Sequence, residues 1–369
     1  MEITEESVTL KITRRKIKSL GRDTMKSAEA INLVYISDKQ KGISRIRKGD
    51  TFKYYFDKNK ISDPEVLIRI KSLVLPPAWE KVWICTSFDG HIQATGVDKN
   101  GRKQYRYHPL WNALRSETKF TQLYDFGLIL NIMRKKINSD LALTGLPLQK
   151  VLATIVSVMQ LTGIRVGNSN YEKLYGSYGL STLKDKHVKI TGQELKFSFM
   201  GKKGIHQNYT LKNKKLAKII NTCKEIPGKE LFQYIDENRQ RKIIDSGMVN
   251  DYIKEISGRH FTSKDFRTWA GSLSAIKAFL ELDYGESSAE TKRKINEALD
   301  ITAEKLGNTR NICRKYYVHP VVIEHYTNKN IEIFIKQGIN NYPGLNAEEQ
   351  VLMNMLAGNN GAATLLPNN

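Results

Sequence analysis

The sequence predicts an α+β protein in which a small β-rich N-terminal domain precedes a larger, mostly helical domain containing a three-stranded antiparallel sheet. Residues 30–115 alternate short apolar runs with turn signals, which is typical of strands and hairpins. From about residue 118 the apolar runs reach helix length. Within that helical region, the segment HVKITGQELKFSFMGKKGIHQNYTL reads as three strands joined by T-G-Q-E and G-K-K-G turns. The predicted organisation is an N-terminal domain, a C-terminal domain and a tail, at residues 1–117, 118–345 and 346–369.

Five segments of the N-terminal region are rich in β-branched and aromatic residues. They are INLVYISD (31–38), FKYYFD (52–57), KVWICTSFDG (81–90), HIQATGVD (91–98) and KQYRYHPLW (103–111). The D-K-N-G step at residues 98–101 has hairpin chemistry and predicts that the last two segments pair.

Four segments of the C-terminal region have helix length and largely apolar faces. They are FTQLYDFGLILNIMRKKI (120–137), LQKVLATIVSVMQLTG (148–163), KDFRTWAGSLSAIKAFLEL (264–282) and SAETKRKINEALDITAEKL (288–306). The final stretch, AGNNGAATLLPNN, is rich in Gly, Asn and Ala and predicts a frayed end.

The composition indicates a basic, globular protein. Lysine and arginine number 59 against 38 acidic residues, which gives a formal net charge of +21. A surface this positive implies a polyanionic partner, and nucleic acid fits best. A membrane surface fits less well, because the charge is spread along the chain and is not gathered beside a lipid-facing amphipathic helix. A basic protein without a specific partner remains the alternative.

The sequence gives no sign of membrane insertion, export or disulfide pairing. No apolar run approaches the roughly 18 residues of a membrane span, and the N-terminus begins with acids and lacks the apolar core of a secretory signal. The cysteines Cys85, Cys223 and Cys313 are scattered and read as reduced thiols of a cytosolic protein.

Familiar nucleotide and metal motifs are absent from the sequence. It has no G-x-x-x-x-G-K-[ST] loop, no G-x-G-x-x-G step after a strand, and no His/Cys/Asp/Glu cluster with metal-ligand spacing. We therefore expect no cofactor and no metal. If the protein cuts phosphodiesters, cations must replace the metal and a protein nucleophile must replace activated water.

Three segments supply candidate cations for such chemistry. LTGIRVGN places Arg165 just past an apolar helix, and FMGKKG places Lys202 at a hairpin tip. FTSKDFRTWAG sets Arg267 near the start of a helix that Thr262 or Ser263 is suited to cap. Each signal alone is also explained by an ordinary solvated charge.

A fourth segment, LGNTRNICRKYYVHP, contains Asn308 and two adjacent tyrosines, Tyr316 and Tyr317. Pro320 disfavours helix at the residue before it, so both phenols are expected near a helix end. Neighbouring helical residues point about 100° apart, so the two phenols serve different faces. Taken alone, the segment also fits two aromatics at the end of a surface helix.

Together and in this order, these segments resemble the type IB DNA topoisomerases, in particular the compact bacterial and poxvirus-like branch. RVGN followed by SYGLSTL, KDFRTWAG and LGNTRNICRKYYVHP carry the resemblance in the C-terminal part. LPPAWEKVWIC and GHIQATGVDKNGRKQYRYHPLW carry it in the N-terminal part, so it covers most of the chain.

The resemblance implies a catalytic role for five residues. The family's nucleophilic tyrosine falls on Tyr317, its two catalytic arginines on Arg165 and Arg267, and its general-acid lysine on Lys202. The fifth position departs from viral and eukaryotic nuclear members, which have histidine where this chain has Asn308. An amide donates a hydrogen bond to a phosphoryl oxygen but does not titrate near neutrality.

The resemblance also implies that the two domains form a clamp around duplex DNA. Basic and aromatic residues alternate in GRKQYRYH, as suits a strand lying against a groove, although an ordinary exposed strand face is the alternative. The expected DNA contacts are Arg102, Lys103, Gln104, Tyr105, Tyr107, Lys203, Lys264 and Arg314.

The expected function is relaxation of supercoiled double-stranded DNA by a monomer in the nucleoid-associated cytoplasm. Single-strand cleavage through a 3′-phosphotyrosyl intermediate, strand rotation and religation would proceed without ATP or metal. Two alternatives remain at this point. Tyrosine recombinases use a similar residue set but usually have histidine three residues before the second arginine, where this chain has Lys264. A non-catalytic, basic DNA-binding protein is the other alternative.

Overall fold

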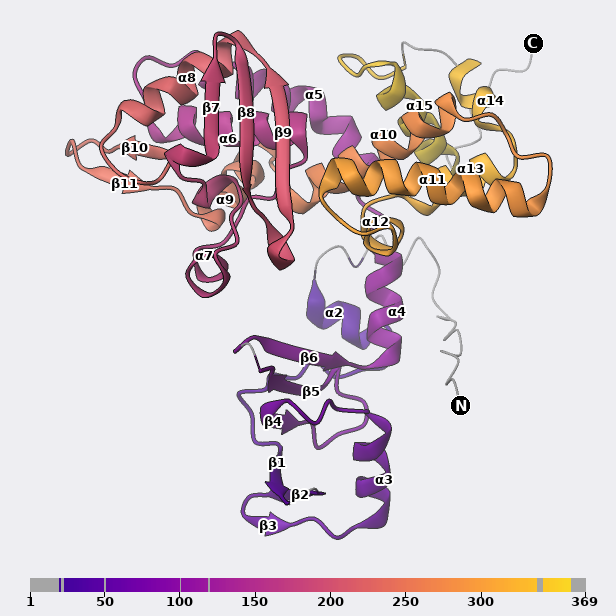
Figure 1. Cartoon of the computed structure of the whole chain (residues 1–369). Helices are drawn as coiled ribbons and strands as arrows, with labels where there is room; N and C mark the ends of the chain where they lie inside the picture. Colours follow the sequence, from indigo (N-terminus) through magenta and orange to yellow (C-terminus); the bar gives the residue numbers. More distant parts are fainter. Residues whose placement is uncertain are drawn as a thin grey trace. The chain divides into compact units, whose positions relative to one another are not determined.

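The computed structural model describes residues 20, 23–49, 51–99, 101–118, 120–336 and 341–359. The chain divides into two compact units between Thr121 and Gln122 (Figure 1). The boundary expected from the sequence, between residues 117 and 118, falls at the end of the helix Pro109–Thr118.

The first unit is built on a six-stranded antiparallel sheet with the order β3-β2-β1-β4-β5-β6. Its strands are β1 (Ile43–Lys48), β2 (Thr51–Phe56), β3 (Asn59–Lys60), β4 (Glu80–Ile84), β5 (Ile92–Val97) and β6 (Lys103–Tyr107). Its helices are α2 (Thr24–Glu29), α3 (Pro64–Ser72) and α4 (Pro109–Thr118). The predicted hairpin joins β5 to β6, where Gly101 takes a φ of +73° and its N–H donates to the Asp98 carbonyl.

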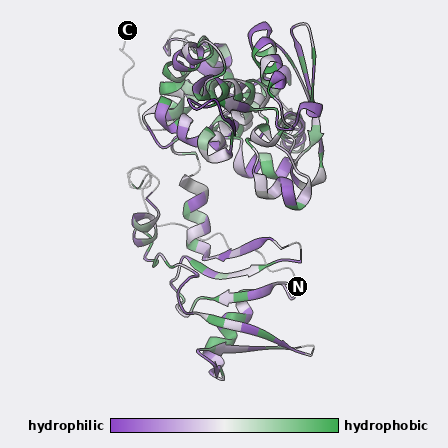
Figure 2. Cartoon of the chain, turned by 90° about the vertical axis from the view of Figure 1, so that its left-hand side faces the viewer, coloured by the Kyte–Doolittle hydropathy of each residue, from purple (hydrophilic) through white to green (hydrophobic). Residues whose placement is uncertain are grey.

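One face of this sheet is covered. Ile43, Ile84 and Ala94 pack there with Ile70 of α3 to form a small core. Hydrophobic and hydrophilic residues both occur along the strands (Figure 2), as expected for a sheet with one covered face.

The first unit differs from the prediction at two points. Residues 31–38 form no strand among the described residues and contribute one isolated bridge, between Val34 and Gly90. Asn32 takes a φ of +56° in the turn that follows α2, so extended backbone cannot begin before Leu33. Strand β1, which the sequence did not predict, lies between β2 and β4 in the sheet. Strand β6 ends at Tyr107 because Pro109 begins α4.

The second unit is mostly helical. Its helices are α5 (Leu123–Asp140), α6 (Leu148–Thr162), α7 (Ser169–Tyr175), α8 (Lys214–Glu225), α9 (Ser246–Ser257), α10 (Ser263–Glu281), α11 (Ser288–Leu306), α12 (Arg310–Tyr316), α13 (Pro320–Thr327), α14 (Ile331–Lys336) and α15 (Ala347–Asn359). Helices α5, α6 and α10 meet in one large core, in which the Phe126 ring packs edge-on against Phe261 and Phe266.

The predicted three-stranded antiparallel sheet is confirmed. Strands β7 (Val188–Thr191), β8 (Glu194–Met200) and β9 (His206–Lys212) pair in the order β7-β8-β9, and α6 and α8 pack against them (Figure 1). A short hairpin not foreseen from the sequence, β10 (Gln233–Ile235) with β11 (Arg241–Ile243), lies between α8 and α9 in the chain.

Helix α15 corrects the expected tail. Residues 347–359 are helical, and Leu352, Met353 and Met355 are fully buried in the core of the second unit. Glu349, 2% exposed, receives two bonds from Arg134, at 2.6 and 2.9 Å, and one from the Trp269 indole at 3.1 Å. This carboxylate ties α15 to α5 and α10. The end of the predicted tail, residues 360–369, lies outside the described residues.

The fold is therefore a mixed α/β one, with a small β-rich N-terminal unit and antiparallel sheets, as predicted. No described helix combines the length and the low polarity that crossing a bilayer requires.

Candidate active site

A pocket of about 260 Å³ in the second unit gathers four of the five catalytic residues expected from separate segments of the sequence, all except Asn308. It is lined by Arg165, Val166, Gly167, Asn168, Tyr171, Ser177, Tyr178, Lys202, Ser263, Lys264, Arg267 and Tyr317. Among the described residues that line it there is no carboxylate. The pocket is therefore suited to an anion.

Arg267 is set by the start of α10. Thr262 is the N-cap, and its N–H donates to the Asp265 side chain at 2.7 Å, which fixes the first turn. The Arg267 side chain, only 4% exposed, donates to the Gly163 carbonyl and, at 3.0 Å, to the Leu306 carbonyl. Its buried Nε has no hydrogen-bond partner among the described residues, an unsatisfied state that is rare outside functional sites.

Arg165 lies just past the end of α6. It donates to the Gly307 carbonyl from Nη1 at 3.3 Å and from Nη2 at 3.4 Å, and also to the Asn308 side-chain oxygen. Burial and the neighbouring Arg267 charge lower the pKa of Arg165, and Tyr317 opposes that shift. An arginine starts from so high a pKa that it stays charged.

Both arginines are held by the C-terminal ends of helices. Gly163 caps α6 with a φ of +72°, and Gly307 caps α11 with a φ of +57°. The last carbonyls of a helix lack intrahelical partners and carry the negative end of its dipole. Backbone oxygens thus orient two guanidiniums without cancelling their charge.

Tyr317 follows the last residue of α12, as expected for a phenol at a helix end. A Cβ at Gly271 of α10 would lie 2.6 Å from the Tyr317 carbonyl oxygen, so glycine permits the close approach. Ser272 donates to that oxygen at 3.3 Å and accepts from the His319 N–H at 3.0 Å. Helix α10 therefore carries Arg267 and, one turn later, the cradle for Tyr317.

The Tyr317 phenol lies in a positive field. The Arg267 guanidinium carbon is 4.8 Å from the ring centroid. Burial alone would raise the pKa of Tyr317, but the charges of Arg267, Arg165 and Lys264 outweigh it and hold the pKa below its usual value. Tyr316 does not line this pocket, and its ring lies 5.9 Å from the Lys315 ammonium.

Lys202 lies at the tip of the β8–β9 hairpin, where it is exposed and lines the pocket.

Asn308 lies behind Arg165, since its amide oxygen accepts from that side chain and its amide nitrogen donates to the Leu306 carbonyl at 3.5 Å. The Lys203 side chain lies outside the described part of the structure, and Arg314 is exposed on α12.

The residues expected to contact DNA in the first unit divide between the two faces of β6. Tyr105 and Tyr107 stack with ring centroids 5.8 Å apart, and Lys103, ion-paired with Asp38, lies over the Tyr105 ring at 5.5 Å. Gln104 points to the opposite face, as strand alternation requires.

Asp98 holds the other two polar residues of this group. Gln104 donates to its carboxylate at 2.8 Å, and Arg102 does so at 2.7 Å. The structure therefore brings three of the five residues onto one face of β6 and ties the remaining two to one carboxylate.

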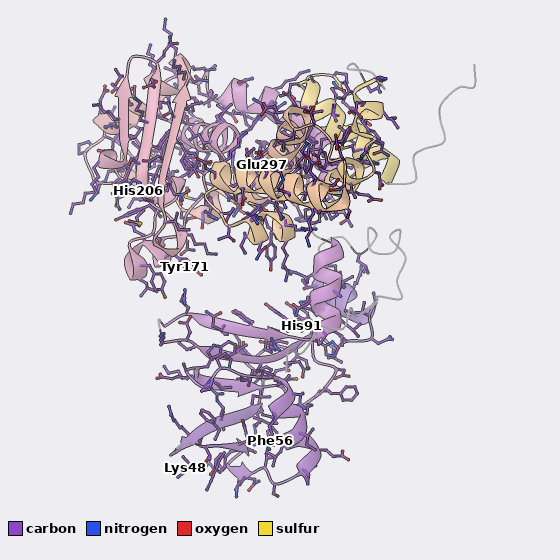
Figure 3. The ribbon with its side chains drawn as sticks, turned by 45° about the vertical axis from the view of Figure 1, so that its right-hand side comes forward. Lys48, Phe56, His91, Tyr171, His206 and Glu297 are labelled. Carbon is purple, nitrogen blue, oxygen red and sulfur yellow. The ribbon has the colours of Figure 1, made fainter. Side chains whose placement is uncertain are left out.

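Sequence reasoning missed Tyr171 and Tyr178, which also line the pocket. Tyr171, 45% exposed, projects from the short helix α7 (Figure 3). The available signal was its position in RVGNSNYEKLY, six residues after Arg165.

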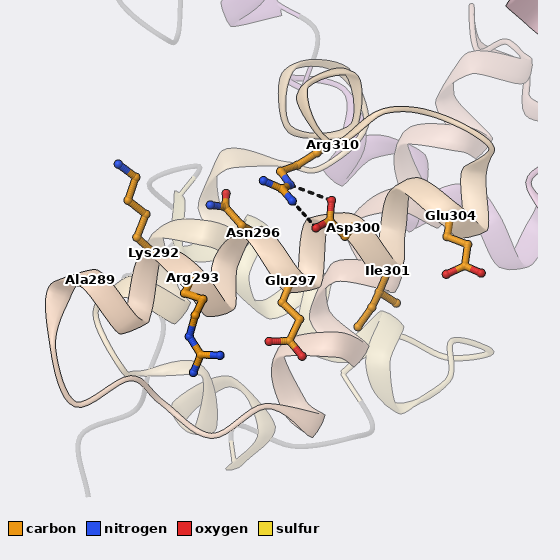
Figure 4. Close-up of a pocket in the computed structure, with 9 residues that line it drawn as sticks. All are labelled: Ala289, Lys292, Arg293, Asn296, Glu297, Asp300, Ile301, Glu304 and Arg310. Carbon is orange, nitrogen blue, oxygen red and sulfur yellow. Dashed lines mark hydrogen bonds and ion pairs between the residues drawn. The ribbon is translucent and has the colours of Figure 1, made fainter.

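A second and larger groove, of about 620 Å³, runs along the outer face of α11 (Figure 4). It mixes acids and bases, and a two-point ion pair joins Asp300 to Arg310 at the start of α12. No phenol is found among the described residues that line this groove, so we do not propose it for attack by a tyrosine. Across the described ranges, no three His, Cys, Asp or Glu side chains are grouped to hold a metal ion.

Comparison with known proteins shows the family of the chain. Residues 110–340 match the family described as the eukaryotic DNA topoisomerase I catalytic core, and residues 51–98 match the bacterial DNA topoisomerase IB N-terminal domain. The chain is 35% identical over 303 residues to DNA topoisomerase 1B of Acanthamoeba polyphaga mimivirus, covering 80% of this chain and 90% of that protein. It is 27% identical over 244 residues to DNA topoisomerase 1B of vaccinia virus strain Copenhagen, covering 64% and 72%.

Proposed function

Because this chain belongs to the type IB DNA topoisomerases, we propose that it relaxes supercoiled duplex DNA with Tyr317 as the nucleophile. The chain is an isomerase that changes DNA topology. The observation that supports Tyr317 is that, of the tyrosines lining this pocket, its ring lies against the Arg267 guanidinium, 4.8 Å from carbon to centroid, with Arg165 and Lys202 lining the same pocket.

The first step is attack of the Tyr317 oxygen on a backbone phosphorus. A phenol with a pKa of about 10 is ionised in only about one molecule per thousand at pH 7. The charges of Arg267, Arg165 and Lys264 lower the pKa of Tyr317 and raise that fraction. A bond forms between the phenolic oxygen and phosphorus as the bond to the deoxyribose 5′-oxygen breaks.

Arg165 and Arg267 stabilise the charge that gathers on the non-bridging oxygens. A guanidinium presents two directed donors and stays protonated. Because helix-end carbonyls already orient both groups, little reorganisation is needed as the transition state forms. Asn308 supports Arg165 by accepting through its side-chain oxygen, and its amide nitrogen is the donor that we propose for a phosphoryl oxygen.

The 5′-oxygen is a poor leaving group and needs a proton as its bond breaks. Lys202, exposed at the hairpin tip and lining the pocket, donates that proton as the general acid. The products are a 3′-phosphotyrosyl bond and a free 5′-hydroxyl, which can rotate about the intact strand.

Religation is the same reaction in reverse. The phosphotyrosyl bond keeps the energy of the phosphodiester it replaced, so resealing needs no nucleotide. The arginines occupy the place that a metal clamp takes in other phosphoryl transfers, so we expect activity without added metal ions.

We further propose that both units contact the duplex and together form a clamp. In the first unit Lys103, Tyr105 and Tyr107 share a face that suits phosphates and base edges, with Arg102 and Gln104 beside it. In the second, the phosphate contacts are Lys203, Lys264 and Arg314. A monomer acting in the nucleoid-associated cytoplasm fits this substrate.

The test is relaxation of negatively supercoiled plasmid in EDTA without ATP. We expect stepwise relaxation by the wild-type protein, none by Tyr317→Phe, and near-normal relaxation by Tyr316→Phe. Denaturing the reaction should trap a 3′-phosphoryl adduct that peptide mass spectrometry assigns to residue 317. Tight binding without relaxation would indicate a passive binder, joining of specific sites a recombinase, and an adduct on Tyr316 a different nucleophile.

A further inference from the structure

Gln207 of β9 has a buried amide outside the pocket and outside every role assigned above. It is 6% exposed and follows the hairpin tip that carries Lys202. Strand β9 is an edge strand of the three-stranded sheet, on the side toward α11 (Figure 1). Figure 3 labels its neighbour His206, which by contrast is exposed.

The stem of Gln207 packs against the residue before Lys202. A Cβ at Gly201 would lie 2.7 Å from Gln207 Cγ and 3.2 Å from the Ile205 carbonyl oxygen. The Gly201 N–H donates to that carbonyl at 2.8 Å and closes the hairpin tip. The Gln207 stem therefore fills the space that glycine leaves at the base of the tip.

The head of Gln207 packs against the turn that holds Arg165. A Cβ at Gly307 would overlap Gln207 Oε1 and lie 2.6 Å from Cδ. The carbonyl of this same glycine accepts both hydrogen bonds from Arg165, and the next residue is Asn308. One side chain thus lies between Gly201 and Gly307, and each of these glycines adjoins a proposed catalytic group.

Tyr209 fixes the orientation of the amide. Its phenol donates to Gln207 Oε1 at 2.8 Å. Burial raises the pKa of Tyr209 even though Arg267 and Arg165 act in the opposite direction, so near neutral pH the phenol keeps the proton it donates. Tyr209, although close to the charges of Arg165 and Arg267, therefore acts as a hydrogen-bond donor to Gln207 and not as a second nucleophile.

We infer that Gln207 is a positioning residue that holds the Lys202 hairpin in register with the Arg165 anchor, and that Tyr209 keeps its amide oriented. The inference rests on the proposed role of Lys202 as general acid. An exposed lysine on a hairpin tip has many conformations, and a general acid must stand within about 3 Å of the oxygen that it protonates. Contact between the hairpin base and the Gly307 turn restricts that motion.

The consequence is selective. Removing the Gln207 side chain should impair protonation of the 5′-oxygen while leaving Arg267 on the carbonyls of Gly163 and Leu306. A displacement of about 1 Å at a reacting group costs about 100-fold in rate.

The experiment compares single-turnover cleavage of two duplexes that share the strongest site the wild-type protein cuts. One has the normal 5′-bridging oxygen, and the other has sulfur at that atom. A thiolate leaves without a proton, so a defect confined to the general acid disappears on the sulfur substrate. We expect Gln207→Ala to lose about 10- to 100-fold on oxygen and less than about threefold on sulfur. Tyr209→Phe should show the same pattern with a smaller loss.

Three controls separate the possible failures. The cleavage rate of Lys202→Ala should recover on the sulfur substrate. If it does not, Lys202 is not the general acid, and the proposed function fails at that residue while the contacts of Gln207 stand. Arg267→Ala, which removes the arginine held by the Gly163 and Leu306 carbonyls, should be slow on both substrates. Thr210→Ala, at an exposed position of the same strand, should match the wild type on both.

The inference is overturned if sulfur rescues Lys202→Ala while Gln207→Ala stays equally slow on both substrates. Thermal unfolding is measured for every variant. If Gln207→Ala does not fold, Gln207→Asn, which keeps the amide on a shorter stem, and Tyr209→Phe take its place, and the same comparison decides.

Discussion

In the first unit the cations expected to meet DNA are paired with carboxylates, whereas the two arginines of the pocket in the second unit are held by backbone carbonyls. Lys103 is ion-paired with Asp38, and Arg102 with Asp98 at 2.7 Å. Arg165 and Arg267 form no ion pair with a described acidic residue and donate instead to helix-end carbonyls.

The difference shows that a protein can position a cationic side chain either with or without neutralising its charge. A carboxylate partner neutralises a lysine or arginine and competes with phosphate for it. A carbonyl orients the guanidinium but leaves its net charge available. The first arrangement suits adjustable, salt-sensitive binding, and the second suits stabilisation of a transition state.

The strongest challenge to this comparison is to remove one cation of each kind. We expect Arg267→Ala to lower the single-turnover cleavage rate about 1,000-fold at saturating DNA, because a preorganised donor is lost. Arg102→Ala should change that rate less than about threefold and act on affinity instead. Rapid-quench cleavage and filter binding measure the two effects.

Stability provides the control for the first variant. Removing Arg267 leaves the Gly163 and Leu306 carbonyls without this donor, a cost of about 1–3 kcal/mol for each group left unsatisfied. Arg267→Lys keeps the charge without the planar fork, so near-normal cleavage by this variant would contradict a requirement for two directed donors.

A second test converts the pocket into the arrangement of the first unit. Asn308→Asp places a carboxylate on Arg165, which should neutralise it and cost about 100-fold in cleavage, against about tenfold for Asn308→Ala. The mirror change, Asp98→Asn, should leave cleavage at saturating DNA unaltered. Equal rates for the two Asn308 variants would show that uncancelled charge is not what the pocket needs.

The pH dependence distinguishes tyrosines of the two units. With the pKa of Tyr317 lowered, the cleavage rate should rise with pH as the phenolate fraction grows and level off below pH 10. Lys264→Ala removes one of the cations that lower this pKa, so the levelling should move to higher pH and the rate at pH 7 should fall about threefold. Burial raises the pKa of Tyr107, so this phenol should ionise only above its usual range in an ultraviolet titration, with Tyr107→Phe as the control. If the pH–rate profile is the same in Lys264→Ala as in the wild type, the charge of Lys264 does not influence the pKa of the nucleophile.

The smallest expected effect concerns the paired cations. Asp38→Asn frees Lys103, so we expect DNA affinity at low salt to rise about two- to threefold, with log K falling more steeply with log salt by about 0.9. Lys103→Ala should flatten that dependence. Cleavage at saturating DNA should stay constant in both, and a change there would place Lys103 in the chemical step.

The sequence predicted the long amphipathic elements well. Helices α6, α10 and α11 and the β7–β9 sheet follow from apolar periodicity and turn residues. The β1 strand and the burial of α15 did not follow. ISRIRK carries three cations in six residues, and α15 owes its place to distant groups such as Arg134 and Trp269.

The candidate site was predicted as residue types and not as a network. Motifs identified Arg165, Lys202, Arg267 and Tyr317, and the structure places all four around one pocket. What the motifs do not contain is the partner of each group. Apart from the Asn308 side chain, the acceptors are main-chain oxygens of Gly163, Leu306 and Gly307, and any residue offers the same carbonyl.

The glycine-capped ends of α6 and α11 have a consequence for DNA cleavage by incompletely folded copies of the protein. Fraying of either terminus releases the oxygens on which the arginines rest, so we expect a partly unfolded copy to lose the fixed position of its guanidiniums before it loses its positive surface. Such a copy still adheres to DNA but is poorly equipped to open a strand that it could not close. Because the last turns of two helices position the arginines of the pocket, we expect only the completely folded protein to cleave a DNA strand.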